Sequence, residues 1–116
     1  MKDAKRHLQK VNLHDLTKDF EGDWRNFIVT EINDHVIRAS VLNRDFHWHS
    51  HEDSDETFLV LEGTLELDHE GGTETLTAGE LFTVPKGIKH RTRAQGRVLN
   101  LTFGQRETDV TGGKGP

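Results

Sequence analysis

The sequence predicts an all-β domain whose antiparallel strands form a sandwich or barrel. Short segments with alternating apolar residues recur between turn residues, at roughly the 8- to 12-residue spacing typical of such folds. No interior segment shows a convincing helical period. Hydrophobic residues make up 32% of the chain and charged residues 30%, which favours a compact core with thin walls. At 116 residues the chain is expected to form one domain that buries about 65% of its unfolded surface.

The first 23 residues are interpreted as an N-terminal arm followed by a short docking segment. The arm is basic and polar, so it is expected to be solvated. Leu13, Leu16 and Phe20 then follow a spacing that fits a helical turn, although a strand remains possible. The folded domain is predicted to span residues 24–104, and the polar tail, residues 105–116, is expected to be disordered.

The domain is predicted to open with a hairpin. Residues 26–32 and 35–42 are strand-like, and Asn33-Asp34 forms the turn between them. A histidine strand over residues 47–51 should follow. Residues 56–61 are apolar on both faces, so that strand is expected to be covered twice, and a homodimer is one source of the second cover.

The second half of the domain is predicted to contain five further strands. Residues 64–69 and 73–78 form a hairpin around Gly71-Gly72, where glycine tolerates the positive φ of a tight turn. Residues 80–85 form a short strand that ends at Pro85, and strands over residues 88–93 and 98–103 follow. In residues 88–93 the two-residue period turns His90 inward and the basic side chains outward.

The segment HWHSHEDSDETFLVLEG, residues 47–63, concentrates side chains suited to metal binding. In a strand, His47, His49 and His51 share one face. Neutral imidazoles with a carboxylate from a neighbouring strand suit a borderline divalent metal such as Zn, Fe, Mn or Ni. The chain has no cysteine, so a thiolate site and a disulfide framework are both excluded.

Charge and hydropathy exclude several other classes of protein. A formal net charge of -5 argues against a nucleic-acid partner, because such binding needs clustered basic residues. No apolar stretch is long enough for a membrane span, and the start lacks the apolar centre of a signal peptide. We therefore expect a cytoplasmic protein with no membrane partner.

Two spaced motifs resemble those of the cupin superfamily, in particular its small single-domain cupin-2 type. The first motif, G-x5-H-x-H-x4-E-x6-G, is matched at His49, His51, Glu56 and Gly63, with Asn43 in place of the leading glycine. Asn accepts left-handed backbone angles, so this turn is expected to survive. The second motif, G-x5-P-x-G-x2-H-x3-N, is matched at Gly79, Pro85, Gly87 and His90, with Ala94 in place of the final Asn. The resemblance covers roughly residues 40–103.

The resemblance implies a jelly-roll β-barrel with one divalent transition metal (Fe, Mn, Zn or Ni) inside it. By position, the metal ligands would be His49, His51, Glu56 and His90. His47 has three readings: a ligand, an acid or base at the pocket mouth, or a polar rim residue. It is retained as the catalytic candidate, because the chain contains no Tyr and no second carboxylate is placed at the site by spacing.

Strand parity predicts a largely apolar pocket, lined by Phe58, Val60, Ile88 and Thr92. Arg38 either pairs with a substrate carboxylate or phosphate or is an ordinary exposed arginine. The functional hypothesis is a metal-dependent enzyme of oxygenase or isomerase type that acts on a small organic acid or sugar derivative. The alternatives are a non-catalytic module that binds or senses a small molecule, and a protein in which the metal is only structural.

Overall fold

The computed structural model describes residues 8–106, which form a short helix followed by antiparallel strands. The elements, in chain order, are α1 Leu13–Thr17, β1 Trp24–Ile32, β2 His35–Leu42, β3 Glu56–Glu62, β4 Leu65–His69, β5 Gly72–Leu76, β6 Leu81–Val84, β7 His90–Ala94 and β8 Val98–Gln105. Every strand pairing among them is antiparallel. The all-β prediction is therefore confirmed.

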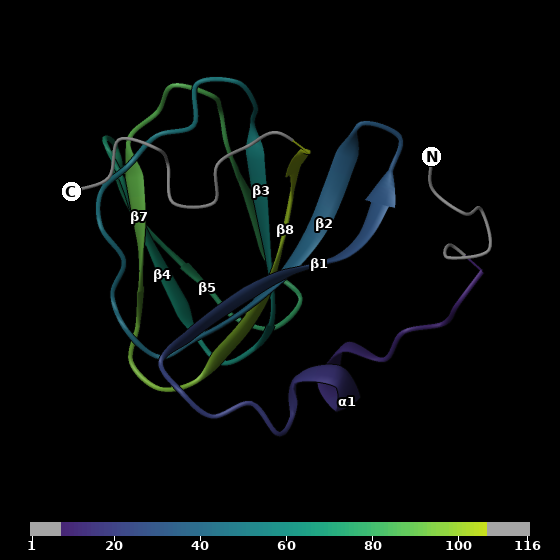
Figure 1. Cartoon of the computed structure of the whole chain (residues 1–116). Helices are drawn as coiled ribbons and strands as arrows, with labels where there is room; N and C mark the ends of the chain where they lie inside the picture. Colours follow the sequence, from purple (N-terminus) through teal and green to yellow (C-terminus); the bar gives the residue numbers. More distant parts are fainter. Residues whose placement is uncertain (1–7, 107–116) are drawn as a thin grey trace.

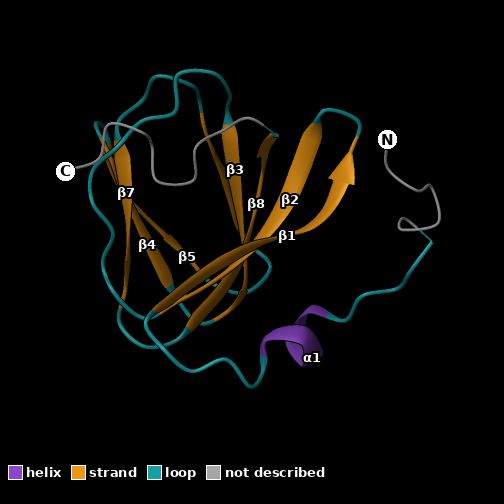
Figure 2. Ribbon diagram, viewed as in Figure 1, coloured by secondary structure: helices purple, strands orange, loops and turns teal. Residues whose placement is uncertain are grey.

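The strands form two sheets that face each other as a sandwich (Figures 1 and 2). One sheet has five strands in the order β1-β2-β8-β3-β6, and the other has three in the order β5-β4-β7. Between the sheets lies the interior cluster, whose fully buried members include Val60, Leu65, Leu67 and Val98. Burial of these side chains is the main force that holds the two sheets together.

The five-stranded sheet carries a second apolar cluster on its outer face. This outer-face cluster is built on Ala39, Val41, Leu99 and Leu101, with Leu59, Leu61 and Phe103 packed beside them. Leu13 and Phe20 pack against the same cluster, so the N-terminal segment supplies part of its cover. The second face of β3, which was predicted to be covered, is therefore covered in part by residues of the same chain.

The docking segment contains a helix, which resolves the alternative that the sequence left open. Asn12 caps α1 by accepting a hydrogen bond from the amide of Asp15 at 2.9 Å. Arg97 holds the end of the helix, since its guanidinium donates to the Thr17 carbonyl at 2.5 Å and to Glu62 at 2.7 Å. Leu16, however, is exposed, and only part of the predicted apolar stripe faces the sheet.

The predicted histidine strand over residues 47–51 is wrong as regular secondary structure. The segment runs beside β7 and makes a single isolated bridge, in which His49 and His90 exchange backbone hydrogen bonds of 3.0 and 2.9 Å. Phe46 N–H also donates to the Thr92 carbonyl at 2.8 Å, but the contacts do not extend into a continuous ladder. The two-residue alternation nevertheless holds, because Trp48 is exposed whereas His49 and His51 are buried.

Asn43 replaces the motif glycine in a way that the sequence did not predict. Its backbone does not adopt a left-handed angle; among the described residues other than glycine, only Asn33 has a positive φ. Instead, the Asn43 side chain accepts a hydrogen bond from the Gly96 amide at 2.9 Å. The tie joins the start of the histidine segment to the turn before β8. At the other end of the domain, β8 continues to Gln105, and the predicted disordered tail lies almost entirely outside the described residues.

Candidate metal centre

The four predicted metal ligands lie close together between the two sheets, at the end where β3 and β7 begin. His49 and His51 come from the segment before β3, Glu56 is the first residue of β3, and His90 is the first residue of β7. One possible ligand atom from each residue lies within 4.8 Å of the others. The three histidines are 6%, 5% and 1% exposed, so the cluster is shielded from bulk water.

Backbone carbonyls set the orientation of two of the imidazole rings. His49 Nδ1 donates to the His47 carbonyl at 2.9 Å, and His90 Nδ1 donates to the Ile88 carbonyl at 2.9 Å. In both rings the proton therefore resides on Nδ1, which leaves the Nε2 lone pair available. A hydrogen bond of this kind is how proteins commonly orient a metal-binding histidine.

Glu56 brings a negative charge among the imidazoles. Its Oε1 atom lies 3.2 Å from His51 Nε2 and 3.3 Å from His90 Nε2. Two ligands at bond lengths of about 2.1 Å from one metal are about 3.0–3.4 Å apart when they are neighbours in an octahedron or tetrahedron. The observed separations match that spacing.

The Nε2 atom of His51 supplies an independent indication of a cation site. It is buried and, although it lies 3.2 Å from Glu56 Oε1, it makes no contact with hydrogen-bond geometry in the part of the chain that the structure describes. Buried polar atoms without a partner are uncommon and call for an explanation. A cation bound between the imidazoles and the carboxylate would satisfy this atom, so the donor set fits a divalent transition metal.

The protonation states of the cluster also suit metal binding. Burial lowers the pKa of His49 to about 4, aided by the nearby His90 and His51 and opposed by the hydrogen bond to His47. Burial alone would raise the pKa of Glu56, but its contacts with His51 and His90 outweigh burial and lower it to about 2. At neutral pH the site therefore presents a neutral His49 and an ionised Glu56.

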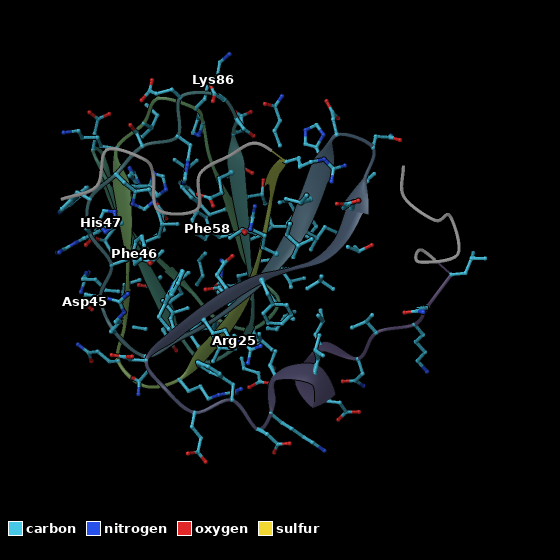
Figure 3. The ribbon with its side chains drawn as sticks, viewed as in Figure 1. Arg25, Asp45, Phe46, His47, Phe58 and Lys86 are labelled. Carbon is cyan, nitrogen blue, oxygen red and sulfur yellow. The ribbon has the colours of Figure 1, made fainter. Side chains whose placement is uncertain are left out.

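His47, the catalytic candidate, lies next to the centre without being part of the four-residue cluster. Its ring stacks on Phe46 with a centroid separation of 4.3 Å and lies 5.3 Å from the His49 ring. Figure 3 shows His47 and Phe46 on the segment beside β7, with Phe58 between the sheets. Besides this ring contact, the backbone carbonyl of His47 accepts a hydrogen bond from His49 Nδ1 and so orients the His49 ring.

The cavity beside the centre is more polar than the sequence predicts. Phe58 and Thr92 line it as expected, whereas Val60 is fully buried and Ile88 packs at the edge of the interior cluster. A first compartment of about 40 Å³ is lined by His49 and Glu56 together with Trp24, Asn26, Ser40, Leu42, Phe46, Phe58, Thr92, Asn100 and Thr102. The wall formed by β1, β2 and β8 is therefore largely polar, whereas Phe46 and Phe58 supply apolar lining, and the expectation of a largely apolar pocket holds only in part.

Sequence reasoning missed the polar wall because the usual rule places polar strand faces in water. Asn100 and Thr102 alternate with Leu99 and Leu101 along β8, and the polar pair is the one that points inward. The apolar pair belongs to the outer-face cluster. The alternation itself was visible in the sequence, but its direction required the neighbouring sheet.

Comparison with known proteins agrees with the fold and with the placement of the motifs. Residues 43–103 match the cupin domain family. An uncharacterised protein of Bacillus subtilis, YdbB, is 37% identical over 85% of this chain and 88% of its own length. The chain therefore belongs to the cupin domain family.

Solved structures support the same assignment. A cupin-2 domain protein from Shewanella frigidimarina is similar with a TM-score of 0.78 and 32% identity, over 83% of this chain and 94% of the other. Protein NMB1881 from Neisseria meningitidis is similar with a TM-score of 0.73 and 24% identity, over 84% and 99% of the two chains. The second likeness concerns the fold alone.

Proposed function

We propose that this cupin binds one divalent transition metal (Fe, Mn, Zn or Ni) through His49, His51, Glu56 and His90. We further propose that it is an enzyme of oxygenase or isomerase type that acts on a small organic acid or sugar derivative. The observation that carries the proposal is the buried, partnerless Nε2 atom of His51 within the four-residue cluster. Three neutral donors and one carboxylate offset part of the charge of a divalent ion and leave coordination positions for a ligand.

A metal bound there would supply Lewis acidity toward a substrate oxygen or a redox centre, depending on its identity. The residues of the chain position and shield the reaction. Phe46 and Phe58 line the compartment beside His49 and limit the access of water, and the His47 carbonyl holds the His49 ring in place. The His47 ring, stacked on Phe46, is the candidate for proton transfer near the cavity.

A non-catalytic small-molecule binding module is the second candidate, and one observation favours it. In the part of the chain that the structure describes, the ionisable side chains that line the cavity are His49, Glu56 and Arg38. The first two are proposed ligands, and arginine does not exchange protons at neutral pH. A substrate whose turnover needs a separate acid or base would therefore depend on His47.

The proposal includes a homodimer in the cytoplasm. The outer-face cluster supports the dimer, because Leu59, Leu61 and Phe103 are only partly buried there. Ile32 and Leu81, on strands at opposite edges of the same sheet, are 55% and 61% exposed. Exposed apolar side chains on a sheet that also carries a partly buried apolar cluster are typical of an interface between copies. No helix among the described residues is long and apolar enough to cross a membrane.

Elemental analysis of protein purified without added metal tests the metal site. Wild type is expected to contain close to one equivalent of a transition metal, whereas His51→Ala, Glu56→Gln and His90→Ala should each lose most of it. Removal of one donor from a four-residue set weakens binding strongly because the others cannot rearrange in a buried site. Circular dichroism checks that each variant is folded.

His35→Ala is the matched control, since the His35 side chain is half exposed and, among the described residues, its hydrogen bond is to its neighbour Asp34 at 2.8 Å. It should keep the wild-type metal content, and so should His47→Ala, whose backbone carbonyl is retained. If folded His51→Ala and His90→Ala keep full occupancy, the site assignment is wrong. Loss of the metal from His47→Ala would instead make His47 part of the centre.

A further inference from the structure

We propose that Arg38 is the anion-recognition residue of the cavity and that the ligand of this protein is a small carboxylate. The carboxylate would contact the Arg38 guanidinium on one side and the metal centre on the other. This inference rests on the proposed metal site, and it names the chemical class of the ligand and the residue that selects it. It also resolves the two readings of Arg38, because the side chain faces the interior.

The position of Arg38 follows from the register of the five-stranded sheet. On β2 it stands opposite Ile28 of β1 and Thr102 of β8. It shares its face with Val36 and Ser40, which are 2% and 7% exposed. Arg38 lines a second compartment of about 30 Å³ together with Asn26, Val36, Glu56, Thr102, Gly104 and Gln105. Because Asn26, Glu56 and Thr102 line both compartments, the second adjoins the first.

The Arg38 guanidinium has no ion pair or hydrogen bond within residues 8–106, in contrast to the other inward-placed charge. Glu56 lies in the same compartment, but its Oε1 atom points to the proposed metal centre, 3.2 Å from His51 Nε2 and 3.3 Å from His90 Nε2. Arg38 is partly buried as a residue, and a guanidinium that is withdrawn from water without a partner gives up hydration without compensation. Its planar fork of donors matches a carboxylate in bidentate geometry.

Charge balance in the cavity points to the same ligand class. Across the lining of both compartments, Glu56 contributes one negative charge and Arg38 one positive charge, and His49, whose Nδ1 donates to the His47 carbonyl, would bind a metal through Nε2 as a neutral ring. A divalent cation bound to the cluster would therefore leave an excess of two positive charges in a poorly hydrated space. An anionic ligand offsets that excess, whereas a neutral ligand does not.

The wall around Arg38 can bind the remainder of a polar ligand. The carboxamide oxygen of Asn26 is buried and has no hydrogen-bond partner among residues 8–106, so it can accept a hydrogen bond from a ligand hydroxyl. Together the two compartments hold about five water molecules, or a ligand with about as many non-hydrogen atoms. Hydroxy acids with two or three carbons have that size.

Calorimetric titration of the Zn²⁺-loaded protein tests the proposal, because zinc has no redox chemistry that would consume the probe. The probes are glycolate and lactate, and each is compared with its neutral amide. Wild type is expected to bind the acids more tightly than the amides. Arg38→Met should weaken acid binding about 10- to 100-fold and leave amide binding nearly unchanged. The affinity of Arg38→Lys for the acids should lie between those of wild type and Arg38→Met, since lysine keeps the positive charge but cannot form the bidentate contact.

Arg25→Met is the matched control. Arg25 lies on the same hairpin but on the outer face, with its guanidinium 5.5 Å from the centroid of the Phe20 ring and 5.6 Å from that of Phe27. It should bind both acids as wild type does. Zinc affinity, measured separately, should be unchanged within about twofold in Arg38→Met.

The outcomes separate this inference from the proposed metal site. Failure of wild type to bind zinc at the cluster would refute the metal site itself. If zinc-loaded wild type binds neither acid more tightly than its amide, the carboxylate class is wrong. If Arg38→Met keeps the preference for acids, or loses acid and amide binding equally, Arg38 is not the residue that selects the anion.

Discussion

Gly63, directly after β3, shows how closely one residue can be constrained by its surroundings. Its φ is +83°, and a Cβ atom added there would lie 2.3 Å from the Arg97 carbonyl oxygen and 3.2 Å from Val98 Cα. Both contacts are with backbone, which cannot rotate away. Glycine is therefore required at this position of the first motif for conformation and for space.

Replacement of Gly63 by alanine is expected to lower the free energy of unfolding by about 2–4 kcal/mol, through backbone strain and overpacking together. Gly79→Ala is the matched control. Gly79 has a similar φ of +88° but no atom within 4 Å of an added Cβ, so only the strain of about 1 kcal/mol applies. Urea unfolding followed by circular dichroism measures both. Equal losses in the two variants would show that the Arg97 carbonyl moves aside without cost.

His47 shows, also at the scale of one residue, that the type of a residue does not determine all of its contacts. The sequence placed it on the face of the other histidines, and the structure shows that its carbonyl orients His49 while its ring stacks on Phe46. A backbone carbonyl is present whatever the side chain. The identity of residue 47 therefore does not reveal this backbone contact, and the catalytic role of the ring stays a prediction.

At the scale of elements, an ion-pair network joins β4 to β7 on the strand that carries His90. Asp68 accepts hydrogen bonds from Arg93 at 2.7 and 3.0 Å and from Arg91 at 2.8 Å, and its side chain is 10% exposed. Its hydrogen bonds to Arg93, Thr73 and Arg91 hold the pKa of Asp68 far below its usual range, although burial acts the other way. The predicted outward basic face of β7 thus has a structural partner.

Asp68→Asn is expected to lower the free energy of unfolding by about 1–3 kcal/mol at pH 7. A carboxyl group whose pKa is depressed in the folded state stabilises the fold above its unfolded pKa of about 3.9. That stabilisation is lost as the pH falls through the folded pKa. The difference between wild type and Asp68→Asn should therefore shrink as the pH is lowered below about 4.

Urea unfolding at pH 7, 4 and 2.5 measures that difference. Glu70→Gln, at an exposed turn position, is the control and should stay within about 0.5 kcal/mol of wild type at pH 7. A difference for Asp68→Asn that is the same at every pH would mean that its effect is steric rather than electrostatic.

Strand β8 shows which part of an element follows from sequence. Its alternation of apolar and polar residues predicted a strand correctly, and the pairing with β2 and β3 confirms it. The direction of its polar face was not predictable from the strand alone. Both faces are covered here, so the polar face lines the cavity and the apolar face belongs to the outer-face cluster.

At the scale of the whole molecule, the outer-face cluster predicts self-association. Leu81→Glu should convert a dimer to a monomer in light scattering after size exclusion, because a charge would then be buried at the interface. Leu8→Glu is the chemically matched control, since Leu8 is 82% exposed in the N-terminal segment and outside the sheet. A wild-type protein that is monomeric at high micromolar concentration would contradict the homodimer.

The sequence by itself determined the strands, the turns and the identity of the four clustered residues, because these depend on local alternation and fixed spacing. The hairpin of β1 and β2 lies where Asn33-Asp34 placed it, and both cupin motifs are legible without a structure. The helix α1 was one of two alternatives that the sequence left open, and the strand predicted over residues 47–51 was wrong. Whether a short segment forms a helix or a strand depends on its tertiary contacts, and the local sequence does not specify those contacts.

Only the tertiary structure decided which residues surround the centre. His90 reaches Glu56 across 34 positions of sequence because β7 and β3 belong to sheets that face each other. The same packing turns Arg38, Asn26 and Asn100 inward. Two facing sheets bring residues that are distant in sequence side by side. No local pattern encodes which face of a strand the opposite sheet will cover.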